Sequence, residues 1–446
     1  MSLIITQVDF VLVAKQAMLN RNLLLMTITM ATSQQSNNLP ASSRWRALGP
    51  GIILSAAAVG GSHLVASTQA GALFGWQLWW LILLVNVIKY PFFRFGVTYT
   101  LNNQESLIAG YYRKGPWYLR TFILLNLIGA VVNTAGVLLL TASLLKLFLP
   151  DSWSLNLISA GLLAICVALL LAGHYRSLDR LAKLIMFSLT VATIVAVAIA
   201  WQQDTSPPAD FISPSPWELA ALGFLVAMMG WMPVPIELSA INSLWIRSKQ
   251  KLMNLSLRDC LFDFNLGYWV TAVLALLFLA LGALIQFGNP QPVAMAGGQF
   301  ASQFVAMYRD TIGPWSEYLV GAIAFLCMFG TTLAVLDGYA RTLRESFRVI
   351  GQHGDKPNWQ MSEAGWLILQ AIAGLALIMF FRGALGPMLT FAMTLAFITT
   401  PFFAWLNFSL AHRQPLALKW RVYGWIGVLY LTLFALGFLL WSALLS

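Results

Sequence analysis

Long apolar runs dominate this sequence and limit what it can fold into. Hydrophobic residues make up 59% of the 446 residues and charged residues only 9%, whereas soluble domains carry about a quarter charged residues. Runs of roughly 20 apolar residues, enough for a helix to cross a bilayer, recur from residue 47 onward. We count eleven, at approximately 47–75, 76–101, 119–149, 153–173, 179–202, 216–245, 263–288, 314–343, 363–381, 384–408 and 419–445. The sequence therefore predicts an all-α polytopic membrane protein whose main partner is the lipid bilayer.

The basic residues gather in alternate connections between these runs. With the amino terminus inside, the inner side receives the clusters at 44–46, 113–114, 176–183, 247–258, 341–356 and 413–421. This asymmetry obeys the positive-inside rule, and an odd number of spans leaves the carboxyl terminus outside. The net charge of +10 is explained by this topology, so no nucleic-acid partner is indicated. We expect an integral protein of the bacterial inner (plasma) membrane.

The chain divides into a short tail and one membrane domain. Residues 1–43 are only weakly apolar, contain no run long enough to span a bilayer, and lack a convincing signal-peptide cleavage site. We expect a disordered or non-native tail there, with a single transmembrane domain over 44–446. Within that domain, repeat one covers about 44–202, repeat two about 216–408, and an extra helix about 419–445.

Two of the apolar runs are interrupted in their middle. The first contains Gly60-Gly61-Ser62-His63, and the sixth contains Gly230-Trp231-Met232-Pro233-Val234-Pro235. Glycines weaken a helix and prolines lack a backbone N–H donor. Inside a membrane, backbone that leaves the helix is tolerated only where it is buried in protein or lines a cavity. We therefore expect both segments to be unwound and to line one cavity, with Gly60, Gly61, Ser62 and Val234 in contact with a substrate.

The interrupted runs occupy corresponding places in two units of five runs. An odd number of spans per unit gives the two units opposite orientations, which is the arrangement of inverted-repeat transporters. In such proteins the substrate lies near the bilayer midplane, at the broken helices. The sequence thus predicts an inverted 5+5 repeat with discontinuous helices 1 and 6 and one extra helix.

Polar side chains near the breaks are the candidates for binding, because ionisable groups inside a membrane are costly. His63 could ligate a metal or shuttle a proton, or it could hydrogen-bond the carbonyls that the break frees. Glu237, about one turn after Pro235, could bind substrate, carry a proton or lock two helices in an ion pair. Asn133 in the third run could line the pathway or hold helices together.

Three further charged residues are candidates for gating or coupling. Lys89 could pair with Glu237 or Asp337, or its long stem could reach the inner surface. Asp337 and Arg341 lie one turn apart near the inner end of the eighth run, where a salt bridge could cap or gate. These roles stay open at the level of the sequence.

Motifs around the breaks resemble a known family. Gly49-Pro50-Gly51, followed after the break by Ala70-Gly71-Ala72-Leu73-Phe74-Gly75, resembles the first helix of the Nramp (natural resistance-associated macrophage protein) family of divalent-metal transporters. Met232-Pro233 resembles the Met-Pro-His of that family's sixth helix. The resemblance covers most of residues 44–445. It implies a LeuT-type fold, alternating access, and a metal site at the two breaks.

The sequence departs from the family where the resemblance places the metal ligands. Gly60 and His63 stand where the family's Asp-Pro-Gly-Asn has its Asp and Asn, and Val234 stands where it has a histidine. Asn133 and Gly136 stand where the resemblance places acidic residues linked to proton movement. The resemblance therefore implies the family's fold with altered site chemistry and without the family's proton route.

The break residues limit the metals that could bind. A hard dication such as Mg²⁺ or Mn²⁺ prefers carboxylate and carbonyl oxygens, and the breaks supply no carboxylate. His63 and Met232 would suit a softer ion such as Cu or Zn, and carbonyls of unwound backbone are further ligands. Met229 could add a thioether, although methionine is also common core filler.

We predict a secondary transporter of the Nramp-like type that moves a divalent metal cation, as a symporter with altered coupling. The alternative is a small organic solute, amino-acid-like or anionic, because the amino ends of half-helices favour an anionic group. The sequence has no metalloprotease, nucleophile-elbow or phosphate-loop motif, so we predict no enzyme and no cofactor. A non-transporting sensor on the same scaffold is a further class. No feature sets the oligomeric state, and a monomer fits the pattern.

Overall fold

The computed structural model describes residues 48–173, 175–203, 207–208, 210–289, 297–352, 361–381, 383–413 and 415–445. These residues form helices and contain no β-strand. Within them, seven helices are long and apolar enough to cross a membrane, and shorter apolar helices fill other predicted runs. The protein is therefore integral to the membrane, as predicted, while the exact number of spans stays a prediction. The predicted tail, 1–43, lies outside the described residues.

The elements are grouped here by the two units that the sequence predicts. The first unit comprises α3 (Pro50–Ala58), η1 (Ser62–Ser67), α4 (Thr68–Phe74), η2 (Gly75–Leu78), α5 (Trp79–Asn103), α6 (Leu107–Lys114), α7 (Pro116–Leu145), η3 (Lys146–Phe148), α8 (Leu155–Leu171) and α9 (Tyr175–Ala200). The second comprises η4 (Leu219–Ala221), α10 (Leu222–Trp231), α11 (Leu238–Gln250), α12 (Leu257–Ile285), α13 (Gly297–Ile312), α14 (Ser316–Gln352), α15 (Glu363–Phe380) and α16 (Leu385–His412), and α17 (Leu418–Leu445) follows. Each unit begins with a broken helix, and α6 and α13, which were not predicted, occupy corresponding places after the second helix of each unit.

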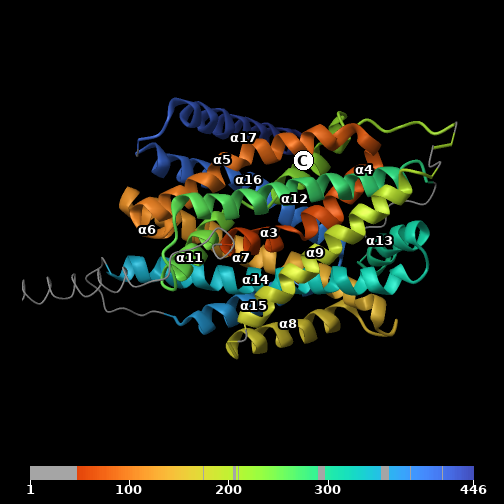
Figure 1. Cartoon of the computed structure of the whole chain (residues 1–446), viewed down its shortest axis with the longest axis horizontal. Coiled ribbons are helices and arrows are strands. Elements are labelled where there is room, and N and C mark those ends of the chain that lie inside the picture. The colour runs from red at the N-terminus through yellow and green to blue at the C-terminus, as the bar shows by residue number, and fades with distance from the viewer. Residues whose placement is uncertain are drawn as a thin grey trace, which may run out of the picture.

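The broken helices lie inside the bundle. In Figure 1 the long helices run along the long axis, with α17 at one edge, α8 at the other and α3 in the middle. α12 packs against α3 and α4, α10 packs against α16, and α7 packs against α14, α15 and α16. Both breaks are consequently enclosed by protein, which is the condition for unwound backbone at membrane depth.

Glycines allow α12 to approach the first broken helix very closely. A Cβ atom added to Gly71 would lie 2.0 Å from the carbonyl oxygen of Leu279, and one added to Gly282 would lie 2.1 Å from that of Thr68. Small residues at helix interfaces let backbones approach and pack within membranes. This reciprocal contact fixes α4 against α12 and so positions the break that precedes α4.

Gly282→Ala is expected to lower the melting temperature of the purified protein in detergent. The added methyl group would meet backbone, which cannot rotate away, and overpacking typically costs about 1–3 kcal/mol. Gly437→Ala is the matched control, because no atom lies within 4 Å of its added Cβ and alanine favours a helix by roughly 0.5–1 kcal/mol over glycine. Equal melting temperatures for the two variants would contradict the close packing.

Candidate functional site

The first interruption lies where the sequence predicts it. α3 ends at Ala58, and the chain resumes as a π-helical turn over Ser62–Ser67 before α4. Side chains of α14 reach carbonyl groups around the break: Cys327 Sγ donates to the carbonyl oxygen of Val59 at 3.3 Å, and Thr331 Oγ1 lies 3.3 Å from that of Ala56. Neighbouring side chains of the protein thus lie at backbone carbonyls that the break leaves without a helical donor.

The second interruption is longer. α10 ends at Trp231 and α11 begins at Leu238, and between them Met232 is extended and joined to Pro233 by a cis peptide bond. Glu237 is the residue that precedes the first turn of α11. The segment is buried throughout, so the prediction of two broken helices is confirmed.

The two breaks meet. Ser62 Oγ lies 3.3 Å from the carbonyl oxygen of Pro233, and a cavity of about 30 Å³ lies beside this contact. That volume has room for about one or two water molecules. The cavity is lined by Ala57, Ala58, Gly60, Gly61, Ser62, Asn133, Val137, Trp231, Pro233, Val234, Pro235, Leu238, Thr331, Val335 and Tyr339.

The structure brings only part of the predicted site together. Five predicted substrate-binding residues line the cavity: Gly60, Gly61, Ser62, Asn133 and Val234. The other four do not, although all are buried: His63, Met229, Met232 and Glu237. The lining also includes aromatic and hydroxyl side chains that the sequence did not single out, namely Trp231, Thr331 and Tyr339.

The indole ring of Trp231 lies between two glycines from different helices. A Cβ added to Gly61 would lie 2.5 Å from the ring, and one added to Gly136 of α7 would lie 3.0 Å from it. The indole Nε1 donates a hydrogen bond to Asn133 Oδ1 at 2.9 Å. The resemblance places acidic residues at positions 133 and 136 of α7. In this chain Asn133 and Gly136 instead contact the Trp231 ring and hold it in place.

Asn133 links the cavity to Glu237. Its Nδ2 donates to Tyr339 Oη at 2.6 Å and lies 3.5 Å from Glu237 Oε1, to which Tyr339 donates at 3.1 Å. The second carboxyl oxygen of Glu237 has no hydrogen-bond partner among the described residues. Glu237 lines a separate cavity of about 20 Å³, which Asn133 also lines. Glu237 thus contacts the site through Asn133 and Tyr339.

His63 is turned away from the cavity. Its Nε2 lies 2.9 Å from the carbonyl oxygen of Thr271 in α12, so this nitrogen must carry the proton that it donates. Its Nδ1 lies 2.8 Å from Ser62 Oγ. Both ring nitrogens are therefore occupied by the protein, and the ring ties the break to α12.

The two residues that the sequence suggested as metal ligands do not meet in the cavity. Neither His63 nor Met232 lines it. Across the described ranges, no group of three or more His, Cys, Asp or Glu residues is arranged to hold a metal ion. The cavity wall instead offers hydroxyl groups, an amide, aromatic faces and backbone.

Lys89 has a different environment from either one that the sequence suggested. Its Nζ is fully buried, so its stem does not reach the inner surface. It donates hydrogen bonds to the carbonyl oxygens of Met229 at 2.6 Å and Gly230 at 2.9 Å, at the carboxyl end of α10. It interacts with Glu237 electrostatically, without direct contact.

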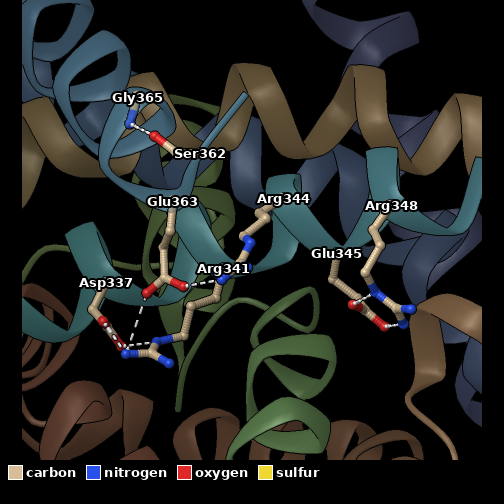
Figure 2. A network of polar contacts seen from close by, with 8 residues as sticks. All are labelled: Asp337, Arg341, Arg344, Glu345, Arg348, Ser362, Glu363 and Gly365. Atoms are coloured by element: carbon tan, nitrogen blue, oxygen red, sulfur yellow. Dashed lines mark hydrogen bonds and ion pairs between the residues drawn. The ribbon is translucent and has the colours of Figure 1, made fainter. Parts of the chain in front are cut away.

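The other predicted gating residues lie apart from the breaks. Arg341 binds both carboxyl oxygens of Asp337, at 2.7 and 2.8 Å, and also contacts Glu363 of α15 (Figure 2). Arg344 contacts the same Glu363, and a second pair joins Glu345 to Arg348. All of these charged residues except Asp337 line a cavity of about 570 Å³ beside the ends of α5 and α11. The predicted salt bridge is present, and its gating role stays a prediction.

Sequence reasoning also missed a buried acid that holds α3. Asp263 of α12 is only 2% exposed, and its carboxylate accepts hydrogen bonds from the backbone N–H groups of Gly49 at 3.0 Å and Gly51 at 2.7 Å. An acid at the amino end of a helix satisfies its free N–H groups and complements its dipole. An aspartate in an apolar run was the available signal.

The comparisons with known proteins decide the family. No protein-family model matches the chain. Uncharacterized protein PM0681 of Pasteurella multocida (strain Pm70) is 49% identical over 415 residues, which cover 91% of this chain and 95% of that protein. This chain belongs to the family of that Pasteurella protein.

Solved structures of membrane transporters share the fold of this chain. A variant of the Eremococcus coleocola manganese transporter has a TM-score of 0.65 at 13% identity, covering 87% of this chain and 85% of that one. MHP1, a nucleobase-cation-symport-1 family transporter solved with bromovinylhydantoin bound, has a TM-score of 0.53 at 16% identity, covering 86% and 82%. The predicted LeuT-type fold is confirmed. Because the likeness extends to transporters of a metal ion and of an organic compound, it defines the fold and not the cargo.

Proposed function

We propose that this protein is a secondary transporter that carries a small organic solute, amino-acid-like or anionic, by alternating access. The LeuT-type fold supports the class, because proteins of this architecture bind their substrates where two broken helices meet. The residues that line the cavity at that place support an organic solute as the transported substrate. This lining is the observation on which the proposal rests.

The cavity wall has the character of a small-molecule site. Trp231 and Tyr339 offer aromatic faces, Thr331 and Ser62 offer hydroxyl groups, and Asn133 offers an amide. Organic ligands are typically bound by apolar and aromatic walls that carry a few fixed polar groups. Among the described lining residues there is no carboxylate, imidazole or sulfur ligand.

A divalent metal finds less support, although the sequence favoured one. A dication inside a membrane needs close oxygen, nitrogen or sulfur ligands and a compensating negative charge. The side chains nearest the breaks that could supply them are His63, Met232 and Glu237, and none of the three lines the cavity. The ammonium group of Lys89, bonded beside Trp231 at Gly230, would repel a dication.

The half-helices favour an anionic group on the solute. Gly61, at the start of the second half of the first broken helix, and Leu238, at the start of α11, both line the cavity. The amino end of a helix carries a partial positive charge and free N–H groups that attract carboxylates. The end at Gly61 carries no acidic residue, whereas Glu237 precedes α11, so a carboxylate of the solute would be stabilised chiefly at Gly61.

Loading requires movement. In this structure the cavity of about 30 Å³ is too small for the solute, because even a small amino acid is larger than the one or two water molecules that would fill it. The half-helices on either side must separate for the solute to enter. Alternating access supplies that separation on one side of the membrane at a time.

Uptake into vesicles tests the proposed cargo. Purified protein in liposomes is given radiolabelled amino acids, short carboxylates and nucleobases, and separately Mn²⁺, Mg²⁺, Zn²⁺ and Cu⁺, with and without proton and sodium gradients. We expect saturable uptake of an organic compound that a metal chelator does not reduce. Empty liposomes give the background. Saturable uptake of a metal ion, with none of any organic compound, would overturn the proposal.

A further inference from the structure

Lys89 is a buried cation without an ion-pair partner. It lies on α5, is 0% exposed, and no carboxylate of the described residues forms a salt bridge with it. Its hydrogen bonds run to two backbone carbonyl oxygens, those of Met229 and Gly230. A buried charge needs compensation, and here the compensation comes from the end of a helix.

The two carbonyl groups that Lys89 contacts lie at the carboxyl end of a half-helix. They belong to the last turn of α10, where the helix stops at Trp231 and its final C=O groups have no intrahelical donors. Such an end carries a partial negative charge. In broken-helix carriers, half-helix carboxyl ends and unwound carbonyls are the groups that coordinate a coupling cation.

We propose that Lys89 is a tethered cation that takes the place of a free inorganic ion at the carboxyl end of α10. Its ammonium group stabilises the first half of the sixth helix in its broken form, and it stays bound throughout the transport cycle. The carrier consequently needs no sodium or potassium ion at this position. Lys89 is a positioning residue: it fixes the end of α10, and with it Trp231, without contacting the solute.

The second half of the same helix has the opposite arrangement. Glu237 precedes the first turn of α11, where a carboxyl group complements the positive end of the helix. Lys89 and Glu237 interact electrostatically across the break. The break is therefore flanked by a cationic residue at the negative helix end and an acidic residue at the positive one.

Ion substitution and chemical rescue test this assignment. The wild-type melting temperature in detergent is measured in sodium, potassium and N-methylglucamine chloride at one ionic strength, and we expect no difference. Lys89→Ala, which removes the ammonium and leaves space, should melt at a lower temperature and recover in part with ammonium or methylammonium chloride, but not with tetramethylammonium. Lys89→Met, which fills the space without charge, should melt low and recover with none of them. Uptake of the solute should follow the same order.

Several results would overturn the proposal. A wild-type protein that needs sodium or potassium for its stability or uptake would do so, as would a Lys89→Met variant as stable and active as the wild type. Equal recovery of both variants, or recovery of Lys89→Ala by tetramethylammonium, would show a general salt effect instead. If neither variant folds, the wild-type ion substitution decides. Only the uptake arm rests on the proposed function: absence of organic uptake in the wild type would contradict that function, while the melting temperatures still test Lys89.

Discussion

Gly61→Ala is expected to cut solute uptake by about tenfold or more, since overpacking of about 1–3 kcal/mol would disfavour the closed arrangement of the breaks. The added methyl group would lie 2.5 and 2.8 Å from two ring carbons of Trp231. The ring cannot yield easily, because Gly136 faces it at close range and Asn133 holds its Nε1. Either the Trp231 ring would have to move out of this position, or the break between α3 and α4 would have to move away from the ring.

Gly60→Ala is the matched control. It makes the same change one residue earlier in the same break, but its added Cβ would have ordinary contacts, the nearest 3.4 Å away at Thr331. Both variants are compared with the wild type by initial uptake rate at equal amounts of inserted protein. An equal loss in both would mean that the break needs glycine for its backbone alone, and not for the fit of Trp231.

Asn133→Leu should also reduce uptake by at least about tenfold, because a buried polar group left without its partner costs roughly 1–3 kcal/mol each time. The substitution removes the acceptor of the Trp231 indole N–H and the donor to Tyr339 and Glu237. Trp231 and Glu237 would both lose a bond within the membrane. The orientation of the aromatic wall of the cavity depends on these bonds.

Asn126→Leu separates this effect from a general loss of stability. Asn126 lies two turns earlier on α7, is also fully buried, and donates to Thr342 Oγ1 at 3.0 Å. It does not line the cavity. We expect both leucine variants to lower the melting temperature, and only Asn133→Leu to abolish most of the uptake. Normal uptake by Asn133→Leu would remove Asn133 from the site.

The chain's own chemistry predicts the architecture well. Adjacent glycines at 60–61 and prolines at 233 and 235 disfavour a helix wherever they occur, so the breaks could be placed from the sequence. The Asp337–Arg341 pair was predictable for a similar reason, because residues four apart lie on one face of a helix. These features depend on neighbours in the sequence.

The direction of side chains was not predictable in the same way. His63 contacts the Thr271 carbonyl, and Lys89 contacts the Met229 and Gly230 carbonyls. Every residue has a backbone carbonyl, so residue types in a sequence do not indicate which carbonyl will accept a hydrogen bond. A search for partner side chains therefore finds no partner for either residue. The seat of Trp231 needs glycines from two helices, Gly61 and Gly136. Its place in the cavity follows from packing that only the assembled fold defines.

The helix α13 was missed for another reason. Residues 297–312 include polar side chains, such as Gln299 and Arg309, at intervals along their length. A search for continuous apolar runs passes over such a helix, because only part of its surface is apolar. Its place after α12 matches that of α6 after α5.

Solute protection of a cysteine in the cavity tests the central claim most directly. Val234 lines the cavity between the breaks, and Val273 on the outer face of α12 is 56% exposed, where lipid would surround it. Val234→Cys and Val273→Cys are made in a chain whose three native cysteines are replaced by alanine, and each is treated with a small water-soluble thiol reagent in liposomes. We predict that the cysteine at position 234 is labelled, that the transported solute protects it, and that the one at 273 is not labelled. A cysteine at 234 that never reacts, or that reacts equally with and without the solute, would contradict a substrate chamber at the meeting of the two broken helices.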